Sequence, residues 1–146
     1  MSNRLEKRRE ERENAFLMIF EWEFDTSRSL EEVYGLAKES REVEDSAYIW
    51  DVLRGIEEHR EELNALIEAN ANGWKRSRLS PVAASVMLLA CYEMLYRDDI
   101  PVRVSLNEAM ELMKKFDEDK ARVFVNGVLN TVAQKIEKKD DSAEEA

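Results

Sequence analysis

Hydrophobic residues recur at spacings of three and four along most of the chain, which is the pattern of amphipathic helices. In residues 3–24, a charged first half precedes an apolar second half that contains Phe16, Ile19 and Trp22. Further segments with helical spacing follow at 30–40, 48–67, 81–97, 105–116 and 119–136. The 48–67 segment is either one helix with a break near His59 or two helices in series. We therefore expect an all-α fold of about seven helices.

Local signals place the helix boundaries. Ser29 with Glu32, and Ser105 with Glu108, have the spacing of capping boxes, in which a hydroxyl and a carboxylate satisfy backbone N–H groups. Ser80-Pro81 is a strong helix start, and Glu44 or Asp45 is positioned to cap the helix that follows it. Gly127 inside the last helix suggests close contact with another helix.

Residues 70–78 contain Gly73 and form the best candidate linker. We accordingly expect an N-terminal helical subdomain at 1–71 and a C-terminal one at 72–137. The remaining residues, 138–146, read as a disordered acidic tail.

Composition narrows the class of protein further. With four Gly and two Pro in 146 residues, the chain has too few turn residues for an all-β fold. The helix at 81–97 is apolar almost all round, so we expect it at the centre of a bundle. The apolar run at 82–92 is far too short to span a membrane, and the charged start has no signal-peptide pattern. Cys91, the single cysteine, fits a core position in a reducing cytoplasm, where we expect the protein.

Charge is spread unevenly along the chain. The formal net charge is −10, which argues against a simple nucleic-acid binder. Residues 39–68 carry ten acids and three arginines, a net −7, and residues 137–146 contribute a further −3. The rest of the chain is neutral and contains local basic runs, so the acidic 39–68 segment is a candidate surface for a basic protein partner.

Catalytic chemistry is not evident in the sequence. His59 is the single histidine and lies among four glutamates, which is typical of a solvated helix face. One histidine and one cysteine do not form a metal cluster, and no phosphate-binding loop or nucleophile motif occurs in the sequence. We therefore expect a binding protein, not an enzyme, with no cofactor and no metal.

Two basic clusters are candidates for binding RNA. The first lies on the leading helix, where Arg8 and Arg12 are four residues apart and Arg9 lies beside them. Guanidinium groups suit bidentate contacts with phosphate. The second comprises Lys75, Arg76 and Arg78 around Trp74, where an aromatic ring beside cations suits stacking on bases. Either cluster is also compatible with a solubilising surface.

Several motifs along the chain follow the order and spacing of one known family. The opening stretch Arg8-Arg9 through Arg12-Glu13-Asn14-Ala15, followed by Phe20 and Trp22, is similar to the arginine-rich first helix of that family. Segments 92–93, 99–102 and 107–109 (YE, DIPV and NEA) are close to its "YEL…DIPxxVxINEA" pattern, and 124–129 reads FVNGVL, as in the family. Residues 48–55 (YIWDVLRG) are also similar. Over about residues 8–136, the chain therefore resembles the NusB family of bacterial transcription antitermination factors.

The resemblance implies an all-α fold of two small packed helical bundles and a non-enzymatic function. It implies pairing with the small-subunit ribosomal protein NusE and binding of boxA, a single-stranded RNA element of rRNA leaders, within the RNA polymerase antitermination complex. By family position, the RNA-binding candidates are Arg8, Arg9, Arg12, Phe20, Lys120 and Arg122. The residues that contact the protein partner are not assigned.

Some positions depart from the family pattern. Ala83 stands where the family often has an acid, Leu88 stands where it usually has an arginine, and Glu10 and Glu11 dilute the arginine cluster. Leu88 is either at the rim of the RNA surface or part of the core. Two alternative functions follow: a divergent protein-interaction module with weak or no RNA binding, and a stand-alone relative of the RNA-binding accessory domain of rRNA cytosine methyltransferases.

Overall fold

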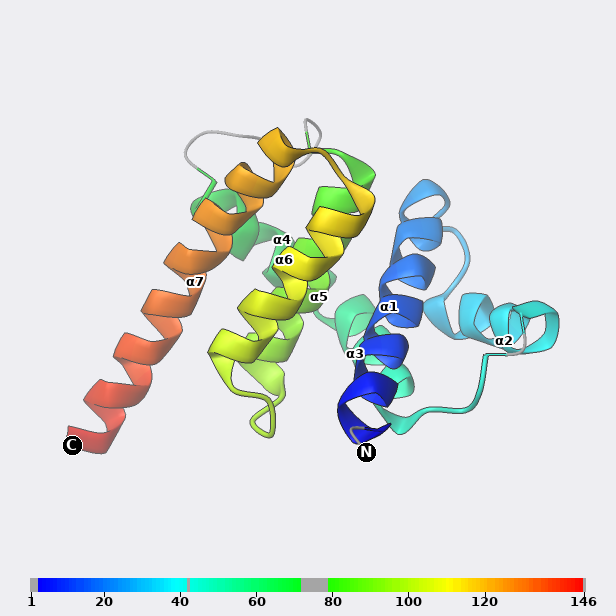
Figure 1. Ribbon diagram of the computed structural model, residues 1–146, viewed down its shortest axis with the longest axis horizontal. Coiled ribbons are helices and arrows are strands. Elements are labelled where there is room, and N and C mark those ends of the chain that lie inside the picture. Colours follow the sequence, from blue (N-terminus) through cyan, green and yellow to red (C-terminus); the bar gives the residue numbers. More distant parts are fainter. Residues whose placement is uncertain (1–2, 42, 72–78, 146) are drawn as a thin grey trace. The chain divides into compact units, whose positions relative to one another are not determined.

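The computed structural model describes the backbone of residues 3–41, 43–71 and 79–145, and the side chains of residues 4–40, 43–71 and 79–137. This part of the chain forms seven α-helices and contains no strand (Figure 1). The all-α prediction is therefore confirmed. The helices fall into two compact units, Met1–His59 and Arg60–Ala146, which we call the N-terminal and C-terminal units.

The N-terminal unit consists of α1 (Asn3–Phe24), α2 (Leu30–Arg41) and α3 (Ala47–Glu58), and each of these helices packs against the other two. The second half of α1 buries its apolar face, which includes Phe16, Ile19 and Trp22. Trp22 also donates a hydrogen bond of 2.9 Å from its indole Nε1 to the carbonyl oxygen of Arg28, between α1 and α2. Burial of these residues fixes the rotation of α1 about its axis and so decides which way its arginines face.

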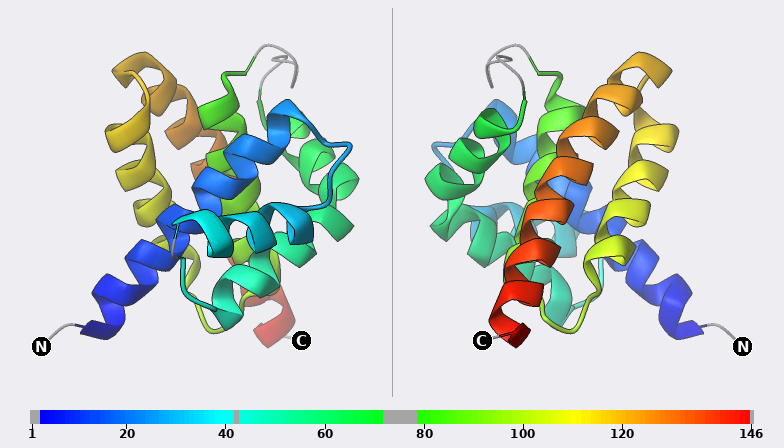
Figure 2. Two further views of the ribbon diagram at one scale, coloured as in Figure 1. Left: turned by 90° about the vertical axis from the view of Figure 1, so that its right-hand side faces the viewer. Right: turned by 90° about the vertical axis from the view of Figure 1, so that its left-hand side faces the viewer.

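The C-terminal unit consists of α4 (Arg60–Ala69), α5 (Pro81–Tyr96), α6 (Val102–Phe116) and α7 (Asp119–Glu145). Helices α5, α6 and α7 pack against one another, and α4 packs against α5 (Figure 2). Every residue of α5 from Ala83 to Met94 is buried. This confirms that the helix that is apolar almost all round is the central helix of its bundle.

Two of the predicted boundaries differ from the structure. The chain divides at His59 and Arg60, earlier than the boundary expected between residues 71 and 72, because α4 packs against α5. Helix α7 continues to Glu145, where we expected a disordered tail from residue 138. No Gly or Pro follows Gly127, and the lysines, glutamates and alanines of this segment favour helix, so no residue ends α7 earlier.

Two of the four capping predictions hold, and so does the predicted break near His59. Ser80 caps α5 by accepting a hydrogen bond of 3.0 Å from the backbone N–H of Ala83, with Pro81 in the first turn. The Ser29 hydroxyl accepts a hydrogen bond of 3.1 Å from the backbone N–H of Glu32, which is the hydroxyl half of the predicted capping box. The break expected near His59 is confirmed, because its N–H closes α3 on the Gly55 carbonyl oxygen at 2.9 Å and α4 begins one residue later.

Three other local predictions are wrong. Ser46, not Glu44 or Asp45, caps α3. Ser105 does not begin α6, which already starts at Val102 after Pro101. Gly127 is exposed on α7, and a Cβ atom there would meet nothing within 4 Å, so this glycine does not serve close helix packing.

Candidate nucleic-acid interface

Arg8 on α1 lies over an aromatic ring of α3. Its guanidinium carbon is 4.5 Å from the centroid of the Tyr48 ring, a cation–π distance. Its Nε lies 3.4 Å from Oε1 of Glu11, one turn further along α1, and 32% of the Arg8 side chain is exposed. The guanidinium therefore lies over Tyr48 of α3, while about a third of the Arg8 side chain remains open to solvent.

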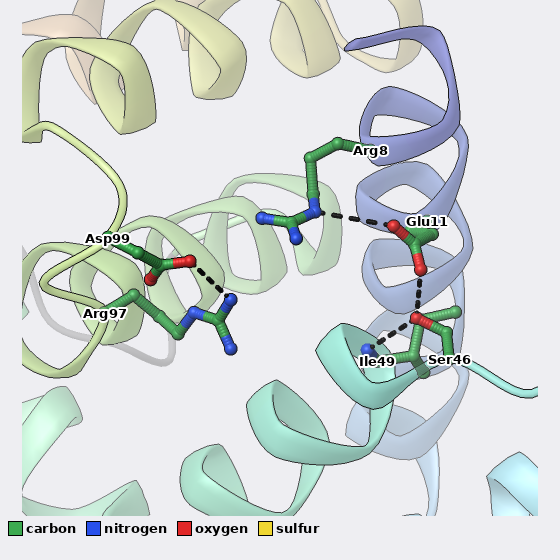
Figure 3. Close-up of polar contacts among 6 residues, drawn as sticks. All are labelled: Arg8, Glu11, Ser46, Ile49, Arg97 and Asp99. Atoms are coloured by element: carbon green, nitrogen blue, oxygen red, sulfur yellow. Dashed lines mark hydrogen bonds and ion pairs between the residues drawn. The ribbon is translucent and has the colours of Figure 1, made fainter. Parts of the chain in front are cut away.

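Glu11 connects Arg8 to the start of α3. Its second carboxylate oxygen, Oε2, accepts a hydrogen bond from the Ser46 hydroxyl. The same hydroxyl accepts a hydrogen bond of 3.1 Å from the backbone N–H of Ile49 and thereby caps α3. Figure 3 shows the continuous chain of contacts from Arg8 through Glu11 and Ser46 to Ile49.

Arg12 occupies the same side of α1 as Arg8 but is buried, with 4% of the residue exposed. Its guanidinium carbon is 5.7 Å from the centroid of the Tyr48 ring. Arg12, one of the RNA-binding candidates, is thus part of the packing between α1 and α3. Arg9, one position along from Arg8, is exposed.

Phe20 lies well away from these arginines. It is half-buried, with its ring centroid 6.2 Å from that of Phe16 and 5.1 Å from that of Phe24. Twelve residues of helix separate Phe20 from Arg8, about 18 Å along the axis at 1.5 Å per residue. Phe24, the last residue of α1, is 66% exposed. The aromatic end of α1 is therefore a separate patch from the arginine cluster.

Lys120 and Arg122 lie in the first turn of α7, in the C-terminal unit. Lys120 is exposed, while the Arg122 guanidinium is 3.4 Å from the Asp119 carboxylate. Residues two apart on a helix do not share a face, so the two cations do not form one phosphate clamp.

The two departures from the family pattern lie in the core. Leu88 is 0% exposed and Ala83 is buried as well, both on the central helix α5. The idea that Leu88 sits at the rim of an RNA surface is wrong. The second basic cluster, Lys75, Arg76 and Arg78 with Trp74, lies outside the described residues.

Sequence reasoning missed three residues of this site. The sequence pattern assigns no role to Tyr48 or Ser46, and it presents Glu11 as a charge that dilutes the arginine cluster. The available signal was the pair of arginines four residues apart together with Glu11, which reaches Arg8 at a spacing of three. Which aromatic ring lies beneath them depends on how α1 packs against α3.

The exposed cations of the described residues are spread over several helices, and α1 carries three of them, Arg4, Lys7 and Arg9, beside the partly exposed Arg8. The sequence matches the NusB family over residues 9–134. It is 41% identical over 128 residues to the transcription antitermination protein NusB of Ruminiclostridium cellulolyticum, which covers 87% of this chain and 88% of that protein. It is 35% identical over 136 residues to NusB of Myxococcus xanthus, covering 90% of this chain and 97% of that protein.

Solved structures agree with the sequence relatives. The fold is similar to T. maritima NusB, with a TM-score of 0.77, 34% identity, and coverage of 87% of this chain and 90% of that chain. It also resembles, at 23% identity and a TM-score of 0.78, the crystal structure of antitermination factors NusB and NusE in complex with dsRNA, covering 87% of this chain and 96% of that chain. At this identity the second likeness speaks for the fold alone.

The chain belongs to the NusB family, a family of non-enzymatic, RNA-binding transcription antitermination factors. Among the described residues, no group of three or more histidine, cysteine, aspartate or glutamate side chains could hold a metal ion. No helix within the described part of the chain is long and apolar enough to cross a membrane.

Proposed function

We propose that this transcription antitermination factor pairs with the ribosomal protein NusE and binds boxA RNA of rRNA leaders, within the RNA polymerase antitermination complex in the cytoplasm. The observation that carries this proposal is the arrangement on α1, where Arg9 is exposed and Arg8 packs against Tyr48 with 32% of its side chain exposed. Arginine forks of this kind suit the phosphates of a nucleic acid backbone. A NusB of the same fold has been solved with NusE and dsRNA, so the proposed assembly is one in which this fold is found.

Arg8 and Arg9 are the proposed phosphate contacts of the first helix. Arg12 contributes by packing against Tyr48, and not by direct contact with RNA. Phe20 and the exposed Phe24 beside it offer rings on which bases could stack, and Lys120 and Arg122 add positive charge at the start of α7.

Net charge explains why a protein partner matters. At −10, the protein repels RNA at long range, while phosphate contacts supply much of the affinity for RNA. A basic ribosomal protein reduces this repulsion and extends the track of cations. Linked binding of this kind is typically worth about 1–3 kcal/mol.

The salt dependence of RNA binding tests the proposed contacts. We expect Arg9→Ala to weaken binding of a boxA RNA and to lower the slope of log K against log salt by about one unit, as for one lost phosphate contact. The matched control is Arg54→Ala, which removes an exposed arginine from α3 and should leave the slope unchanged. Equal slopes for wild type and Arg9→Ala would mean that Arg9 only solubilises the protein.

A second candidate function is a protein-interaction module that binds RNA weakly or not at all. The acidic 39–68 segment supports it, because Glu57 and Glu58 are exposed at the end of α3 in the N-terminal unit, and Glu61 and Glu62 are exposed on α4 in the C-terminal unit. Exposed acids of this kind suit a basic protein partner. Binding of NusE that persists while boxA RNA binds neither the free protein nor the pair would favour this candidate.

A further inference from the structure

Glu11 makes structural contacts that its neighbour Glu10 does not share. Only 18% of its side chain is exposed, and its two carboxylate oxygens have different partners: Oε1 faces Nε of Arg8, and Oε2 accepts the hydrogen bond from the Ser46 hydroxyl. Glu10, the next acid along α1, is exposed. The two acids carry the same charge within the arginine cluster, but only Glu11 makes these contacts with Arg8 and Ser46.

Ser46, which donates a hydrogen bond to Glu11, is itself held in place by other contacts. Its backbone N–H donates a hydrogen bond of 2.8 Å to the Tyr34 hydroxyl oxygen, and its side chain caps α3 through the Ile49 N–H. Glu11 is therefore anchored to the junction of α2 and α3, and not to a mobile side chain. Through Glu11, the same anchor reaches the guanidinium of Arg8.

Two contacts restrict the position of the Arg8 guanidinium. Its carbon lies over the ring of the buried Tyr48, 4.5 Å from the centroid, and its Nε contacts Oε1 of Glu11. Because the guanidinium is a rigid planar fork, holding its carbon and its Nε also restricts the direction of its Nη1–Nη2 edge. Figure 3 shows both Nη atoms pointing away from Glu11.

We propose that Glu11 is a positioning residue for RNA binding, which holds Arg8 so that its Nη1–Nη2 edge receives a backbone phosphate of the RNA. This inference rests on the proposed function and names the ligand group of one residue within it. An arginine that is already ordered loses less side-chain freedom when it binds. Beyond about 8 Å, the repulsion from a single carboxylate is largely screened at physiological salt. An acid in this cluster thus strengthens RNA binding.

The opposite expectation follows if Glu11 acts only through its charge. Removal of any acid beside the arginines would then strengthen RNA binding, and Glu10 and Glu11 would behave alike. The two accounts predict changes of opposite sign for the same loss of charge, so a matched pair of variants separates them.

The experiment compares Glu11→Ala with Glu10→Ala in titrations of fluorescein-labelled single-stranded boxA RNA at several salt concentrations. We expect Glu10→Ala to bind as tightly as wild type or more tightly. We expect Glu11→Ala to bind about tenfold more weakly than Glu10→Ala, the factor for one lost charge-assisted hydrogen bond. Glu11→Gln, which keeps an acceptor for either Ser46 or Arg8, should fall between the two and also serves if the alanine variant does not fold.

A double-mutant cycle tests whether the effect passes through Arg8. In an Arg8→Ala background, Glu11→Ala should no longer weaken binding, because the group that Glu11 positions is absent. If Glu11→Ala binds RNA as tightly as Glu10→Ala, or if its effect persists without Arg8, the positioning role is refuted. If wild type and Glu10→Ala both fail to bind the RNA, with or without NusE, the proposed function itself fails.

Discussion

Ser105 on α6 donates a hydrogen bond of 2.7 Å to Oε1 of Glu93 on α5, and both residues are buried. The hydroxyl that the sequence pattern assigns to a helix cap thus ties two helices of the C-terminal unit together. We expect Ser105→Ala to lower the free energy of unfolding by about 1–2 kcal/mol, because it removes a buried hydrogen bond to a carboxyl group. Urea denaturation measures this loss. Ser40→Ala, at an exposed position of α2, is the control and should change stability by less than about 0.5 kcal/mol; equal losses would contradict the role of the buried pair.

Arg9 and Arg12 should separate in their effects on stability. Arg12 is buried against Tyr48, so Arg12→Ala should cost about 2 kcal/mol through lost packing and lost contacts of the guanidinium. Arg9→Ala should leave the free energy of unfolding nearly unchanged, as expected at an exposed position. Thermal unfolding of the two single variants measures the difference. If both variants change the free energy of unfolding equally and only slightly, the packing role of Arg12 is contradicted.

Leu88→Arg tests whether the arginine that is usual in the family can be restored. Leu88 is 0% exposed on the central helix, so a buried, unpaired guanidinium should cost more than about 3 kcal/mol. Denaturant unfolding measures this cost. Leu36→Arg, at an exposed leucine of α2, is the matched control and should cost little. A stable Leu88→Arg variant that binds RNA more tightly would contradict the core assignment.

Cys91 gives stability a predictable dependence on alkaline pH. Burial raises the pKa of its thiol from 9.0 to about 12. Above about pH 9 the unfolded chain loses this proton while the folded chain keeps it, so stability falls as pH rises. Between about pH 8 and pH 10.5, we expect the free energy of unfolding of wild type to fall relative to that of Cys91→Ala. A difference that does not change with pH would show that the thiol ionises equally in both states.

Helix positions were predictable because their signals are local. Ser80-Pro81 and the break at His59 depend on residues within one turn, and the structure keeps both. The position of Ser105 was predicted wrongly for two reasons. Helix α6 starts a turn earlier, directly after Pro101, and the Ser105 hydroxyl donates its hydrogen bond to the carboxylate of Glu93 on α5. Whether the Ser105 hydroxyl caps a helix or bonds to another helix depends on how the helices pack, and the spacing of Ser105 and Glu108 does not show this.

The candidate site was predictable only in part. Helical spacing places Arg8 and Arg12 on one side of α1, but not which of them the packing of α3 covers. Glu11 was counted as a charge because the sequence does not show that Ser46 would reach it. Leu88 was ambiguous for the same reason, since burial on the central helix depends on the helices packed around it.

The most direct test of the whole account is the affinity for boxA RNA with and without the ribosomal partner NusE. Fluorescence titration of the labelled RNA, at one fixed salt concentration, gives both dissociation constants. The account predicts weak binding by the free protein, because of its net charge of −10, and binding at least tenfold tighter once NusE is present, about 1.4 kcal/mol of coupling. Equal affinities in the two titrations would contradict it.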